Sequence, residues 1–218
     1  MATFDVLQNP LETGSYDQAN MKPSSSPHHT SIQSQLQPAL PGILFAVLTL
    51  LYGFGIGIVF GLNEDLIKDH LKDSAVEVQD SVYEGDAAAM KPILSKSWAY
   101  MKRAHLHAGG LGASAIGLIL LVGHLGVSAA LSRAISLGLG VGGLGYSIFW
   151  MCAGFRAPAL GSTGAAKESL AWLAMPSSGA VVVATFAVAL LVLVRIVRCP
   201  KPANEHDVES QVKNSSSQ

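Results

Sequence analysis

The stretch from Ala104 to Gly123 constrains this chain more than any other, because it contains no Asp, Glu, Lys or Arg. Each helical residue rises about 1.5 Å, so a helix of this length crosses a hydrocarbon core of roughly 30 Å. Trp98 and Tyr100 precede the stretch and suit the headgroup zone, and Lys102 and Arg103 can extend their charges towards water. The stretch therefore predicts a membrane-spanning helix.

Three further apolar runs also have the length of a bilayer span. They cover residues 40–62, 134–154 and 180–197, so with 104–123 we expect four spans. Charged residues make up 13% of the chain, against about 25% in soluble domains. The sequence thus predicts an all-α integral membrane protein in which residues 39–198 form a four-transmembrane-helix bundle.

Glycines recur inside these runs. Gly53, Gly57 and Gly61 are spaced four residues apart, which places them on one stripe of a helix. The run 134–154 contains the sequence L-G-L-G-V-G-G-L-G. Because small residues let two membrane helices approach closely, we expect glycine-mediated packing, with Gly57 in such a contact.

Two of the polar connections have helical features. Residues 63–86 form an amphipathic pattern, with Asn63 as an N-cap and acidic residues in the first turn. This segment is acidic on balance, so we expect it to cover the bundle rather than to bind anionic lipid. In the third connection, Ser162 or Thr163 can cap a short interfacial helix.

The ends of the chain are polar, and we expect residues 1–38 and 199–218 to be disordered tails. The first tail lacks the basic start and early apolar core of a secretory signal peptide.

Four spans place both tails on one side of a plasma or inner membrane. The basic residues that flank the spans are Arg195, Arg198 and Lys201 on that side, and Lys102, Arg103, Arg156 and Lys167 on the other. The positive-inside rule does not decide between these groups; we expect the tails to be cytoplasmic, because no acid adjoins the first group before Glu205.

Nitrogen and sulfur donors gather at one predicted membrane depth, on the side opposite the tails. The residues that predict a metal site there are His105, His107, Met151, Cys152 and Met175. Imidazole with thioether or thiolate suits copper, and histidine with methionine can hold haem iron. The two histidines with Arg156 and Lys167 predict a cofactor site, in which the cations pair with a haem propionate or a quinone head.

A plainer interpretation of these residues stays open. Histidines near a helix end often only form hydrogen bonds in the interface, and methionines there usually pack. His105 and His107 lie about 200° apart around a helix, so only one of them can face a bound ion. His124 is predicted at the opposite face of the membrane and cannot share a haem with His105.

The sequence contains no motif of a soluble enzyme: no phosphate-binding loop, no H-E-x-x-H and no nucleophile elbow. A net charge of −1 gives no basic field for nucleic acid. We therefore expect a structural, accessory or cofactor-holding membrane protein rather than an enzyme that acts alone. Its partners would be the lipid bilayer and either further copies of itself or a larger membrane complex. The alternatives are a redox subunit that binds haem, copper or quinone near the two histidines, and a small oligomeric transporter.

Overall fold

A computed structural model describes residues 36–198, which leaves both predicted tails outside the described residues apart from residues 36–38. The helices of the described part are η1 (Gln37–Ala39), α2 (Leu40–Val76), α3 (Gln79–Val82), α4 (Ala87–Leu125), α5 (Ala129–Leu160), α6 (Thr163–Glu168) and α7 (Ala171–Arg198). No strand occurs in this part of the chain. The prediction of an all-α fold is therefore confirmed for residues 36–198.

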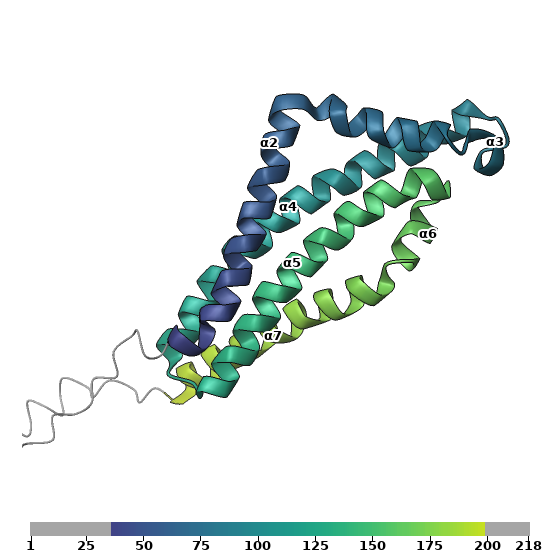
Figure 1. The fold of residues 1–218 in the computed structure, drawn as a ribbon. Coiled ribbons are helices and arrows are strands. Elements are labelled where there is room, and N and C mark those ends of the chain that lie inside the picture. Colours follow the sequence, from purple (N-terminus) through teal and green to yellow (C-terminus); the bar gives the residue numbers. More distant parts are fainter. Residues whose placement is uncertain (1–35, 199–218) are drawn as a thin grey trace, which may run out of the picture. The chain divides into compact units, whose positions relative to one another are not determined.

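Within this part, α2, α4, α5 and α7 are each long and apolar enough to cross a membrane. Neighbouring long helices run in alternating directions (Figure 1). The start of α2, the end of α4, the start of α5 and the second half of α7 share one core cluster that includes Ala46, Val122, Ile135 and Val188. These features are those of a multi-pass membrane protein. The exact borders of the spans stay predictions.

The chain of α2 changes direction at Asn63, whose backbone is extended with φ −161° and ψ 80°. Its side-chain Oδ1 accepts a hydrogen bond of 3.2 Å from the Leu66 N–H, which caps the second half of the helix. That half carries Leu71 and Ala75, both buried, and runs on towards α3 (Figure 1). At α3, the Tyr83 hydroxyl donates a 2.6 Å hydrogen bond to the Pro158 carbonyl, so this polar segment is tied to the end of α5.

Helix α5 lies at the centre of the fold, because it packs against α2, α4 and α7. Its glycines mark the three contacts. A Cβ atom at Gly140 would collide with the backbone of α2 at Gly42, and one at Gly142 would lie 2.9 Å from Val181 Cγ2 of α7. The contact with α4 is equally close, since a Cβ at Gly154 would lie 2.8 Å from Met101 Cε. The glycine-rich run is thus shared among three neighbouring helices.

Two of the three glycines in the stripe on α2 face another described helix. A Cβ at Gly53 would lie 3.0 Å from Ala108 Cβ, and one at Gly57 would lie 2.8 Å from His105 Cε1, so both residues face α4. The expected contact at Gly57 is therefore confirmed. Gly61 has no such contact among the described residues, because nothing outside its own stretch of helix lies within 4 Å of a Cβ built there. Gly61 lies just before the bend at Asn63.

The third connection contains α6, whose N-cap is Ser162. The Ser162 hydroxyl oxygen accepts a 3.2 Å hydrogen bond from the Ala165 N–H. Leu170 follows α6 and is buried beside Tyr100 and Phe149. Helix α7 then runs back along α5, with contacts to α4 that are far fewer than those to α5 (Figure 1).

Candidate functional site

His105 faces α2. Its Nδ1 lies 2.9 Å from the Gly53 carbonyl oxygen, and its ring meets the Phe60 ring edge-on at a centroid distance of 5.8 Å. Because a carbonyl oxygen only accepts, the hydrogen of the neutral imidazole belongs on Nδ1. The absence of a side chain at Gly57 makes the room for this ring. His105 thereby contributes to the packing of α4 on α2.

His107 faces α5 instead. Its ring stacks on that of Trp150 at 6.2 Å and 25°, and it lies 5.2 Å from the Tyr146 ring. The two histidines therefore lie on different sides of α4, as the helical period predicts. In this arrangement they cannot bind the same ion. His124, at the other end of α4, has its Nδ1 2.8 Å from the Leu120 carbonyl oxygen.

The predicted sulfur ligands are also dispersed. Met151 lines a cavity of about 330 Å³ beneath the bend of α2, together with the buried Met101. Cys152 packs near Phe149 instead, and Met175 is 72% exposed. The described residues contain no group of three or more His, Cys, Asp or Glu side chains that could hold a metal. A metal or haem at one of the histidines stays a prediction.

The two cations assigned to a cofactor, Arg156 and Lys167, are exposed on α5 and α6. A different cation lies against the aromatic residues. The Arg103 guanidinium carbon lies 4.9 Å from the Trp150 ring centroid and 5.6 Å from that of Tyr100. We refer to Tyr100, His107, Tyr146, Phe149 and Trp150 as the aromatic cluster. A cation over such rings gains about 0.5–1 kcal/mol when exposed, which limits the positions that the guanidinium adopts.

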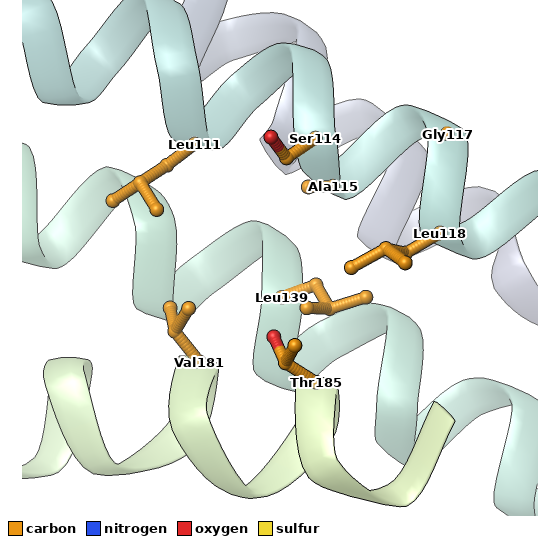
Figure 2. Close-up of a pocket in the computed structure, with 8 residues that line it drawn as sticks. All are labelled: Leu111, Ser114, Ala115, Gly117, Leu118, Leu139, Val181 and Thr185. Atoms are coloured by element: carbon orange, nitrogen blue, oxygen red, sulfur yellow. The ribbon is translucent and has the colours of Figure 1, made fainter. Parts of the chain in front are cut away.

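A groove of about 450 Å³ lies between α4 and α7, with Leu139 of α5 between them (Figure 2). The residues that line it are Leu111, Ser114, Ala115, Gly117, Leu118, Leu139, Val181 and Thr185. The groove exists because α7 packs closely on α5, where Gly138 contacts Ala184 and Gly142 contacts Val181, while the α4 wall carries short side chains.

Two hydroxyl groups interrupt the apolar walls of the groove, one from Ser114 on α4 and one from Thr185 on α7 (Figure 2). Neither hydroxyl forms a hydrogen bond with another described residue. Elsewhere in the bundle, Thr49 donates to the Phe45 carbonyl at 2.7 Å and Ser147 donates to the Gly143 carbonyl at 2.8 Å. Since lipid offers no hydrogen-bond partner, the two groove hydroxyls have unused capacity for a bound molecule.

The groove and the aromatic cluster share one face of α4. Arg103, His107, Leu111, Ser114 and Leu118 recur at steps of four, four, three and four residues, which places them on one stripe. We name this surface the α4–α7 valley. Its residues are Arg103, His107, Leu111, Ser114 and Leu118 of α4, Leu139, Tyr146 and Trp150 of α5, and Leu173, Val181 and Thr185 of α7.

Sequence reasoning missed the valley, although the stripe on α4 is visible in the spacing of the residues. The missing information was which helix lies opposite that stripe.

No family model matches the chain, and no curated protein and no solved structure matches it either.

Proposed function

We propose that this chain is an accessory multi-pass membrane protein that holds a membrane amphiphile, with the apolar chain of that molecule in the α4–α7 valley. The observation that carries the proposal is the groove with the unbonded hydroxyls of Ser114 and Thr185. Ligand sites are typically concavities of about 300–1,000 Å³, apolar apart from a few placed polar groups. The groove has this character, and it opens at the outer surface of the helices, where Ser114 and Thr185 are exposed.

The dimensions of the valley fit an elongated molecule. Arg103 and Ser114 are eleven residues apart on α4, which corresponds to about 16 Å along the helix axis. Leu111 and Leu118 supply apolar contact on the α4 side, and Val181 supplies it on the α7 side. A chain that lies in this groove would be surrounded by side chains on three sides.

Photo-crosslinking tests this proposal. The full-length protein in mixed micelles is exposed to a phospholipid with a diazirine in its acyl chain, and the labelled residues are mapped by mass spectrometry. We expect labels to concentrate on residues 111–118 and 181–185. Leu118→Trp should fill the groove and lower this labelling about tenfold, whereas Leu120→Trp should not. Leu120 is a matched control because it is 41% exposed on the same helix and does not line the groove. Equal labelling of all exposed apolar residues, such as Ile58 of α2, would refute the proposal.

We also propose that both ends of the membrane domain lie on the cytoplasmic side. The start of α2 and the second half of α7 share one core cluster, which supports a common side. Arg195 and Arg198 lie in the last turn of α7, which supports the cytoplasm. Labelling of single cysteines at positions 36 and 198 with a membrane-impermeant maleimide, in intact cells and in lysed cells, tests both statements. Labelling at either position in intact cells would contradict the assignment.

A second candidate function is a redox subunit, and the hydrogen bond of His105 favours it. A histidine that donates from Nδ1 to a backbone carbonyl has its ring held with Nε2 as the free ligand atom, as in many metal-bound histidines. The test is an absorption spectrum with metal analysis of the purified protein and of His105→Ala. A Soret band or stoichiometric copper that the variant loses would support this role. A protein purified from its native membrane without chromophore or metal would exclude it.

A further inference from the structure

We propose that the amphiphile of the α4–α7 valley is a phospholipid and that Arg103 binds its phosphate group. This inference rests on the proposed function and adds the chemical class of the ligand. It is drawn from the position of Arg103 at the end of the valley, the surroundings of its guanidinium group and the distance to the groove.

The guanidinium of Arg103 is held by the two rings that it contacts. Trp150 and Tyr100 lie 4.9 and 5.6 Å from its central carbon. Ring contacts of this kind use the positive charge of the guanidinium, so its N–H donors stay available to another group. These donors form a fork that matches two oxygens of a phosphate. The two rings thus keep the guanidinium beside the aromatic cluster before any ligand binds.

No acidic side chain of the described residues neutralises Arg103. The ion pairs in this part of the chain join Lys68 to Glu64 and Asp65. The aromatic cluster adds a further donor, because the Trp150 Nε1 is buried without a hydrogen-bond partner among the described residues. His107, one turn from Arg103 on the same face of α4, also contacts the Trp150 ring and supplies no negative charge. The cluster thus has an excess of positive charge and of donors, which an anion would balance.

The location of Arg103 favours a lipid phosphate over other anions. Arg103 directly precedes the apolar stretch 104–123, so it is expected at the depth of the headgroups. The groove begins at Leu111, two helical turns further along the same stripe. A single phospholipid could place its phosphate at Arg103 and one acyl chain past Leu111 towards Ser114. A fatty acid or a free phosphate ion would satisfy the charge but lack one of these two features.

The experiment measures binding of palmitoyl-oleoyl phosphatidylglycerol, added in mixed micelles with a neutral detergent, to the full-length protein by isothermal titration calorimetry. Arg103→Gln should weaken binding about tenfold or more, the size expected for losing a charge-assisted hydrogen bond. The matched control is Lys102→Gln, which removes the same charge from the adjacent exposed position. It should change the dissociation constant less than about twofold. Arg103→Lys retains the charge but loses the planar fork, so it should fall between wild type and Arg103→Gln.

The remaining outcomes separate the two proposals. If Leu118→Trp weakens binding but Arg103→Gln does not, the groove binds a lipid chain and the phosphate assignment is wrong. If Arg103→Gln weakens binding but Leu118→Trp does not, an anion site exists and the proposed function is wrong. Inorganic phosphate that competes at equal concentration would overturn the lipid assignment, and dodecanoate that binds as tightly through Arg103 would overturn the choice of phosphate. Should Arg103→Gln fail to fold, the comparison of Arg103→Lys with Lys102→Gln decides, and equal affinities would reject the inference.

Discussion

Helices α5 and α7 lie side by side, yet they differ sharply in how much of each is covered by protein. In the most apolar part of α5, 44% of the residues are buried, against 11% in α7. Helix α5 contacts α2, α4 and α7, whereas α7 packs mainly on α5. Side chains such as Val182 and Phe186 of α7 are mostly exposed.

The more apolar of the two helices is the less buried one. This order is the reverse of that in a soluble protein, where water drives apolar residues inward. In a bilayer the lipid is itself apolar, so helix association depends on close packing and hydrogen bonds. The glycines of α5, rather than its hydropathy, mark the interior of this protein.

The largest effect is expected where two backbones meet. Gly140→Leu should prevent α5 from approaching α2, because even a Cβ there collides with Gly42. We expect a loss of about 3 kcal/mol or more in stability, or no folded protein. The matched control is Gly179→Leu on α7, where no other described atom lies within 4 Å of an added Cβ. Thermal unfolding of both variants in detergent measures the difference, and equal melting temperatures would break the comparison.

A smaller effect is expected at the contact between α2 and α4. Gly57→Leu displaces the His105 ring, which is a side chain and can move more easily than a backbone. We expect a loss of about 1–3 kcal/mol, the usual range for overpacking. Gly61→Leu, one turn further on the same helix, should be nearly neutral because that position is open. A denaturant titration of the pair that shows Gly61→Leu to be the more damaging would contradict the assigned faces.

At the polar end of α5, Tyr83→Phe removes the hydrogen bond to the Pro158 carbonyl. The expected loss is about 1 kcal/mol, the typical net contribution of one hydrogen bond. Burial raises the pKa of the Tyr83 hydroxyl above the ordinary tyrosine value of 10.0. Since the unfolded state then loses its proton first, the stability from this group is complete below pH 10 and falls as the pH rises above it. Unfolding curves between pH 8 and about 11 should therefore show a steeper decline for wild type than for Tyr83→Phe.

The smallest effect is expected on the outer face of α7. Phe186→Ala should change stability by no more than about 0.5 kcal/mol, because Phe186 is 72% exposed and exchanges contacts with detergent or lipid. Val188→Ala on the same helix should cost more, since Val188 is 2% exposed and belongs to the core cluster. A large loss for Phe186→Ala would show that α7 is covered by a further protein surface, such as a second copy of the chain.

The spans and one packing contact could be predicted from sequence because they depend on local information. Length and the absence of charge identify the run 104–123, and a four-residue spacing identifies Gly57. The full length of α4 was not predicted, because its part before residue 104 carries four basic residues, and charge marks the end of the span rather than the end of the helix.

The candidate site was harder to predict because it depends on which helices are neighbours. The helical period separates His105 from His107, and the structure places them against α2 and α5. The period does not show that Ser114 and Thr185 lie on opposite walls of one groove. That pairing follows from the contacts of α5, where Gly138 and Gly142 accept α7, and from the short side chains of α4.

The unbroken length of α4 has a mechanical consequence. Its 39 residues correspond to about 58 Å, nearly twice the thickness of a hydrocarbon core. Between Ile93 and Leu125 it contains no proline, so this part is a continuous, stiff helix that is longer than the hydrocarbon core. A rotation of its polar end about the helix axis would therefore turn Arg103 together with the α4 wall of the groove, because no hinge lies between them.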